Sequence, residues 1–171
     1  MANRRIDVDA EIDRFRAKEQ AGDPSTPSSG YAWYYCKTDG LPYFMNDAGD
    51  VISLAGGDKY FTLTVSGDLT ADPGLLRLYN LTGAALTISK VHLAVNTAPT
   101  GATILVDVNE NGTTIFTTPA NRPSIAISAF TGESTTIEDA SWADGNYLQA
   151  DVDQIGSTIA GADLTITVVA S

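Results

Sequence analysis

The sequence predicts an all-β protein: an antiparallel, jelly-roll-like β-sandwich preceded by an N-terminal helical arm and a small β-meander. Apolar and polar side chains alternate with a period of two along most of the second half of the chain. Turn-forming Gly, Asn and Asp residues separate these stretches at the spacing of antiparallel strands. Helical periodicity is confined to the N-terminus. The predicted parts are a helical arm (1–20), a flexible linker (21–30), a meander (31–56) and a sandwich (57–171).

The predicted arm carries sorted charges and a narrow apolar stripe. Its acidic residues precede its basic ones, an order that complements a helix dipole. A lone amphipathic helix of this length is marginal in water, so its stripe needs a partner. That partner is a neighbouring protein, a short trimeric bundle, or the chain's own sandwich, and disorder of the isolated arm stays open. The predicted attachment residues are Ile6, Val8, Ile12 and Phe15, with Arg14 and Arg16 pairing either with a partner's acids or with helix neighbours such as Asp13.

The next residues predict a tether and then three tiny strands. Gly22, Pro24 and Pro27 end the helix and favour extended backbone. Beyond them, turns at Asp39-Gly40 and at 47–50 separate three short apolar stretches. So many aromatic side chains cannot be buried within so small a unit. We therefore expect the meander to pack on the sandwich or on equivalent chains.

The sandwich region predicts about nine strands. The Asn111-Gly112 step is its strongest hairpin signal, and residues 141–145 are expected to form a loop. In the first strand, Phe61, Leu63 and Val65 share one face. The predicted strands cover residues 58–65, 75–81, 85–95, 103–108, 113–118, 124–128, 134–138, 147–155 and 163–169.

Composition argues against several function classes. The net charge is −11, and residues 101–171 hold nine acidic residues against one base, Arg122. Such a surface repels nucleic acid and anionic membranes, so neither is expected as a partner. No run of 18 apolar residues occurs, and the single cysteine, Cys36, excludes an internal disulfide and a cysteine-based zinc site. The Asn-x-Thr matches at Asn80 and Asn111 are interpreted as chance.

No catalytic motif is present, so we expect no enzymatic activity and no cofactor or metal. The only histidine, His92, lies between Val91 and Leu93 in a predicted strand and is interpreted as structural. Carboxylates are so abundant that no pair stands out as a glycosidase site. The series Asp107-x-Asn109-x-Asn111-Gly112 begins like a calcium loop, but Thr118 stands where the bidentate acid belongs. The hairpin interpretation uses the same residues, and a looser calcium site stays unassigned.

Two stretches resemble virion proteins of tailed bacteriophages. The run YYCKTDGLPYFMNDAGDVISL, Tyr34 to Leu54, resembles a motif of phage fibre and appendage proteins, and Leu76 to Thr118 is similar to the β-sandwich domains that such proteins carry. The resemblance implies a structural protein, often a homotrimer, with an N-terminal anchor and an outward β-rich body. Because the chain lacks a long shaft, a capsid decoration (cement) protein or short head fibre is favoured. Its expected partner is the major capsid protein or another virion protein, and its expected location is the outer surface of the capsid.

The alternative is a tail fibre or adaptor protein whose sandwich binds a host receptor or carbohydrate. Exposed aromatic rings stack on sugars, and two sets of aromatic residues are candidates for this role. The other interpretation is that these side chains seal the meander against the body or against a trimer interface. The residues concerned are Tyr31, Trp33 and Tyr35 in the meander, and Trp142 and Tyr147 in the sandwich.

Overall fold

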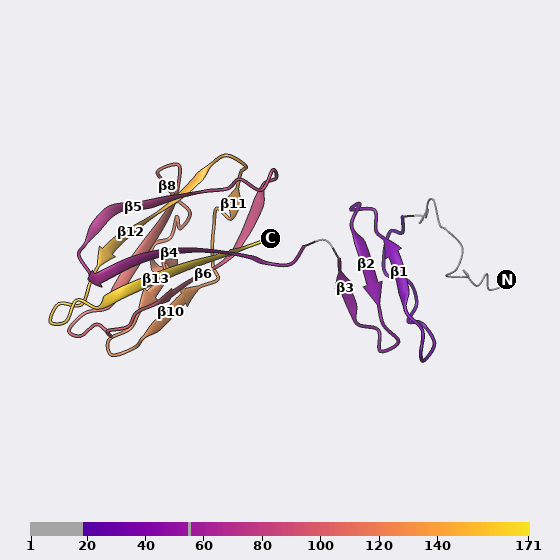
Figure 1. Cartoon of the computed structure of the whole chain (residues 1–171), viewed down its shortest axis with the longest axis horizontal. Coiled ribbons are helices and arrows are strands. Elements are labelled where there is room, and N and C mark those ends of the chain that lie inside the picture. The colour runs from indigo at the N-terminus through magenta and orange to yellow at the C-terminus, as the bar shows by residue number, and fades with distance from the viewer. Residues whose placement is uncertain (1–18, 55) are drawn as a thin grey trace. The chain divides into compact units, whose positions relative to one another are not determined.

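A computed structural model describes residues 19–54 and 56–171 and confirms the all-β class with antiparallel sheets. The chain divides between Gly57 and Asp58 into two compact units, which we describe separately (Figure 1). The predicted helical arm lies almost wholly outside the described residues, with Ile6, Val8, Ile12, Phe15, Arg14 and Arg16 among those not described. Its described end is not helical, because Gln20 forms a β-bridge with Lys37.

The small unit is a three-stranded meander in the order β1-β2-β3, with β1 at Trp33–Cys36, β2 at Pro42–Met45 and β3 at Val51–Ser53. The turn between β1 and β2 requires Gly40, whose φ is +78°. In the second turn, the side-chain oxygen of Asn46 accepts hydrogen bonds from the backbone N–H groups of Ala48 and Asp50. Turn chemistry thus sets the register of the three strands.

Residues 20–30, predicted as a flexible linker, fall in the small unit and contact its sheet. Gln20 exchanges backbone hydrogen bonds with the chain beside β1, donating to Cys36 and accepting from Thr38. Pro27 is buried, and the backbone N–H of Gly30 donates to the carboxylate of Asp47. The proline-rich composition indicated extended backbone, but it did not reveal that this backbone has a sheet to pack on.

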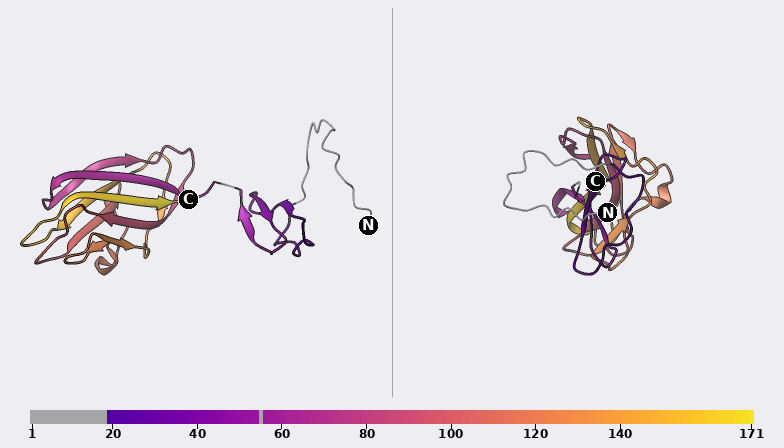
Figure 2. Two further views of the ribbon diagram at one scale, coloured as in Figure 1. Left: turned by 60° about the horizontal axis from the view of Figure 1, so that its bottom comes forward. Right: turned by 90° about the vertical axis from the view of Figure 1, so that its right-hand side faces the viewer.

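The second unit is β-sandwich-like, with two antiparallel five-stranded sheets. Figure 2 and Figure 1 both show β4 and β13 running side by side. The first sheet has the order β10-β6-β13-β4, with β11 paired to β6, and the second has the order β5-β12-β7-β8, with β9 paired to β7. The first sheet comprises β10 (Thr131–Ser134), β6 (Leu86–Ala94), β13 (Ala162–Ala170), β4 (Lys59–Asp68) and β11 (Ser141–Trp142). The second comprises β5 (Asp72–Tyr79), β12 (Tyr147–Gln154), β7 (Ile104–Glu110), β8 (Thr113–Thr114) and β9 (Ser124–Ile125), and a 3-10 turn, η1, spans Pro119–Asn121.

The core is built from the alternate, inward-facing residues of both sheets, which the period of two anticipates. In β4, Leu63 is buried and its neighbours Thr62 and Thr64 are exposed, as the sequence predicts. Trp142 is completely buried, and its ring meets that of Phe61 edge to face at 4.8 Å between centroids. Aromatic pairs favour this geometry. The core also contains Val91, Leu93, Ile104, Val106, Val108, Ile115, Phe116, Leu148, Leu164 and Ile166.

Several strand bounds differ from the prediction because tertiary contacts override local pattern. The strand predicted at 134–138 is instead β10 at Thr131–Ser134, which ends where the Ser134 hydroxyl accepts a hydrogen bond from the Thr136 N–H. Gly132 permits β10 to approach the chain at Ser124 closely, since a Cβ there would lie 1.8 Å from the Ser124 carbonyl oxygen. The expected loop at 141–145 begins with the short strand β11.

A partly buried ion cluster joins η1 to the second sheet. The Arg122 guanidinium contacts Asp107 and Asp153, each at 2.8 Å, and the Thr114 hydroxyl donates to Asp107. Burial raises the pKa of the Asp107 carboxyl, outweighing the hydrogen bond from Thr114 and the charge of Arg122, which lower it. The only base among residues 101–171 therefore serves to neutralise a buried acid.

Removing the Arg122 cation should destabilise the sandwich. We expect Arg122→Met to lower its free energy of unfolding by about 2 to 3 kcal/mol, because Asp107 then keeps a buried charge without its partner. The matched control is Lys90→Met, which breaks the exposed pair with Glu133 and should cost less than about 1 kcal/mol. Urea unfolding followed by Trp142 fluorescence in a Trp33→Phe background measures both. Equal losses in the two variants would contradict the proposed role of Arg122.

Candidate functional site

One face of the small sheet is covered by the chain that precedes it. By register, Trp33, Tyr35, Tyr43 and Met45 share this face. The Trp33 indole N–H donates to the Ser25 carbonyl at 3.1 Å. The exposed fractions of Tyr35 and Met45 are only 3% and 4%. Residues 20–27 thus act as a lid on the sheet, and the unit has a small core of its own.

A charged network fastens that lid. The Tyr35 hydroxyl donates to the Asp23 carboxylate at 2.6 Å, and the Lys37 ammonium contacts the same carboxylate at 2.7 Å. Lys37 also lies 4.1 Å from the centroid of the Tyr43 ring. The hydrogen bond from Lys37 lowers the pKa of Asp23, and burial together with the Asp23 hydrogen bond raises the pKa of Tyr35 to about 12. A neutral Tyr35 beside an ionised Asp23 is therefore the folded state at neutral pH.

The opposite face of the small sheet is apolar. Register places Tyr34, Phe44 and Ile52 in one cross-strand row, and the backbone bond from the Leu54 N–H to the Pro42 carbonyl continues the pairing into a second row. Ile52 and Leu54 leave 53% and 51% of their surface exposed. We call this surface, made of Tyr34, Cys36, Pro42, Phe44, Ile52 and Leu54, the apolar face. None of its members is an Asp, Glu, Lys, Arg or His residue.

The aromatic residues selected from the sequence differ in their exposure. In the small unit Tyr31 is 68% and Trp33 47% exposed, whereas Tyr35 is buried. Trp142 lies in the sandwich core, which corrects the expectation that its ring is available for sugar stacking. Tyr147 is half-buried on the outer face of the second sheet.

Tyr147 belongs to an aromatic pair that sequence reasoning missed. Its ring centroid lies 5.6 Å from that of Tyr79, its cross-strand partner, and the Arg77 guanidinium lies 4.5 Å from the Tyr147 ring centroid. Tyr79 is 46% exposed. Only the pairing of β5 with β12, which are far apart in the sequence, makes the two rings neighbours.

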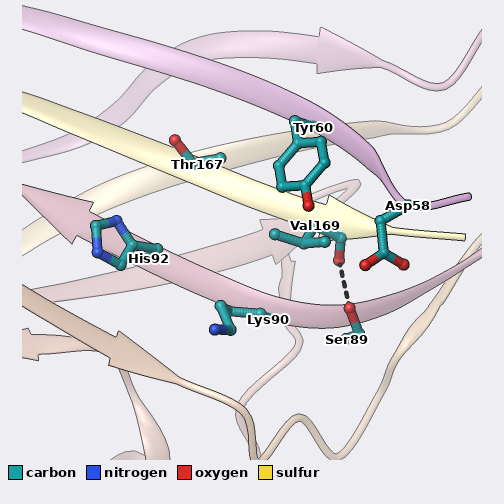
Figure 3. A pocket seen from close by; sticks show the side chains of 7 residues that line it. All are labelled: Asp58, Tyr60, Ser89, Lys90, His92, Thr167 and Val169. Atoms are coloured by element: carbon teal, nitrogen blue, oxygen red, sulfur yellow. Dashed lines mark hydrogen bonds between the residues drawn. The ribbon is translucent and has the colours of Figure 1, made fainter.

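A depression of about 470 Å³ lies on the outer face of the first sheet (Figure 3). We call it the β4–β13–β6 depression, and its lining residues are Asp58, Tyr60, Ser89, Lys90, His92, Thr167 and Val169. His92 points outward into it, as its place between the buried Val91 and Leu93 predicts. The Ser89 hydroxyl donates to the Val169 carbonyl at 3.3 Å instead of to His92. Ser89 and His92 therefore do not form the hydrogen-bonded pair that activates a nucleophile.

The calcium-like motif is occupied by other contacts. Asp107 pairs with Arg122, the Asn109 amide donates to Asp151, and the Asn111 side-chain oxygen accepts from the Tyr147 N–H. Within residues 19–54 and 56–171, no group of three metal-ligating His, Cys, Asp or Glu side chains is assembled. The hairpin interpretation explains this motif.

Asn80, which begins one of the two Asn-x-Thr matches, also has a structural role. Asn80 is fully buried, and its amide donates to the carbonyls of Ala84 and Trp142. Its side-chain oxygen accepts from Thr82. Asn80 therefore holds a loop to the sandwich and offers no accessible nitrogen.

Comparison with known proteins gives no family to which the chain can be assigned. No protein-family model matches it, and no curated protein matches it significantly. None of the helical segments in the described part of the chain has the length and apolarity to cross a lipid bilayer. Function is therefore inferred from the surfaces of the two units.

The lid network predicts a pH dependence for the small unit. Tyr35 should ionise at about pH 12, against about 10 for an unfolded tyrosine. Since the folded state favours the neutral phenol, its stabilising contribution should be complete below pH 10 and lost as pH rises from there to about 12. Carbon-13 NMR of labelled tyrosine, assigned with Tyr35→Phe, measures the titration. Ionisation of Tyr35 near pH 10 in the folded protein would contradict the network.

Proposed function

We propose that this chain is a non-enzymatic structural protein of a tailed-bacteriophage virion. It acts as a capsid decoration (cement) or short head-fibre protein on the outer surface of the capsid. The N-terminal part attaches to the major capsid protein or another virion protein, and the sandwich, with jelly-roll connectivity, projects outward. The observation that carries this proposal is the apolar face of the small unit.

The apolar face is costly to leave in water. Burying apolar surface contributes about 25 cal/mol per Å², and Ile52 and Leu54 alone leave about half of their surfaces exposed. A two- or three-stranded sheet normally needs a packed face for stability, which here the lid already supplies on one side. The second, uncharged face therefore suits a partner that is itself apolar. Contiguous exposed apolar surface of this kind marks protein interaction sites.

The sandwich suits an outward position. Its core is complete, and residues 101–171 carry a strongly negative balance. Like charges keep neighbouring copies soluble and apart when they are crowded on a shell. Gly56 and Gly57, beside which a Cβ would meet nothing within 4 Å, connect the two units. One chain thus combines an adhesive unit with a soluble one.

Attachment would stabilise the shell by mass action. A ligand that binds only the assembled shell lowers the free energy of that state by RT ln(1 + [L]/Kd). A homotrimer would present three apolar faces, and simultaneous binding converts a weak contact into a strong one. The arm residues Ile12 and Phe15 would add a second contact.

Localisation tests the virion role. Antibody-labelled electron microscopy of particles of the virus that encodes the chain should show regular label over the head. Label restricted to the tail would replace the decoration role with that of a fibre or adaptor, and unlabelled particles in the presence of the expressed protein would refute the virion role.

A tail fibre or adaptor protein that binds a host receptor or carbohydrate is the second candidate. The exposed Tyr79–Tyr147 pair and its neighbour Arg77 favour it. Binding of the chain to host cells, lost in Tyr79→Ala, would support this candidate.

Charges placed on the apolar face should abolish attachment. We expect Ile52→Asp with Leu54→Asp to leave the sandwich folded and to reduce binding to particles at least tenfold, because two carboxylates would be desolvated at the interface. Cosedimentation with particles that lack the protein measures binding.

The matched control is Ile127→Asp, an equally exposed isoleucine on the sandwich at 51%. It should bind like the wild type. The arm variant Ile12→Asp with Phe15→Asp is tested beside it, since loss of binding in that variant alone would assign attachment to the arm. Full binding by the Ile52/Leu54 variant would refute the role of the apolar face.

A further inference from the structure

The β4–β13–β6 depression combines an exposed aromatic side chain with polar groups around it. Tyr60 is 70% exposed and lies near the start of β4, at the edge of the first sheet. Its cross-strand partner Val169 is only 8% exposed and forms an apolar floor. Figure 3 shows the polar side chains of Asp58, Lys90 and His92 placed around this floor. An aromatic ring with surrounding donors and acceptors is the arrangement that recognises a molecule with one apolar side and a polar rim.

Strand register fixes the width of the depression. Tyr60, Val169 and Lys90 form one cross-strand row, and Thr62, Thr167 and His92 form the next. Because neighbouring strands lie about 4.8 Å apart, the Cα atoms of Tyr60 and Lys90 lie about 10 Å apart across β13. The space between them accommodates one flat six-membered ring. The volume of about 470 Å³ leaves room for part of a second.

The charges select against an anion. The Lys90 ammonium is paired with Glu133 at 3.3 Å, so its positive charge is already compensated. Asp58 adds a negative charge at the rim, and the chain as a whole carries −11. A phosphate, sulfate or acidic sugar would meet a net negative site. A neutral ligand with many hydroxyl groups would meet donors at Lys90 and acceptors at Asp58.

We propose that the β4–β13–β6 depression binds a neutral saccharide. One pyranose ring stacks its C–H face on Tyr60 above Val169, and its hydroxyl groups bond to Asp58, Lys90 and His92. The site lies on the sandwich and uses none of the residues of the apolar face, so it operates whether or not the protein attaches to a virion. Because the depression is open to solvent, a millimolar dissociation constant per site is expected, and several copies on one particle would raise the avidity.

Chemical-shift titration of the full chain tests this site. The probes are maltotriose and triacetylchitotriose, with N-acetylneuraminic acid as the anionic comparison. At least one neutral probe should give saturable shifts of the Tyr60, Lys90, His92 and Thr167 amides. The anionic probe should bind more weakly.

Variants of exposed aromatic residues on the sandwich provide the matched comparison. Tyr60→Ala should weaken binding of the neutral probe at least tenfold, whereas Phe130→Ala, which removes another exposed ring (57%), should leave it unchanged. Tyr60→Leu keeps an apolar β-sheet residue and controls for folding, and it should also weaken binding because it has no ring. The proposal is overturned if neither neutral probe gives saturable shifts in the millimolar range, if the shifts map to Tyr79 and Tyr147, or if the anionic probe binds more tightly.

Discussion

The alternation of side chains across each strand is the constraint on which this structure depends. Every sheet has two faces, and each face must lie against water or against packed protein, whichever suits its side chains. The sandwich meets this constraint internally, with the inward residues of one sheet packed on those of the other. The small sheet meets it on one side only, where residues 20–27 form a lid held by Asp23 and Tyr35. Its other side presents apolar residues to water. That difference between the two units is the physical basis for the proposal that the first attaches and the second is displayed.

The lid also explains why a unit so small has a defined structure. Residues 20–30 add backbone pairing at Gln20, a buried proline and a carboxylate that binds both Tyr35 and Lys37. Each contact is modest, because a hydrogen bond in the folded chain replaces one to water. Together they replace the second sheet that a larger domain would use. The small unit thus has a core of its own on one face of its sheet.

The sequence predicted the all-β class but few of the features that form the surfaces. Alternation in residues 58–65 correctly placed Leu63 inside and Thr62 outside, and the Asn111-Gly112 turn marked the hairpin between β7 and β8. Local pattern could not show that Trp142 fills the core or that Tyr79 neighbours Tyr147, because both depend on pairing between distant strands. Proline and serine indicated extended backbone at 21–30, yet extended backbone serves equally as a tether or as a lid. The depression around Tyr60 required the register of three strands, which no single segment encodes.

A cryo-electron microscopy reconstruction of the virus particle tests the central claim most directly. The account predicts that density for residues 20–54 lies against the shell, with Ile52 and Leu54 buried at the contact and the acidic sandwich projecting outward. A reconstruction in which the sandwich contacts the shell and the apolar face stays in solvent would contradict it.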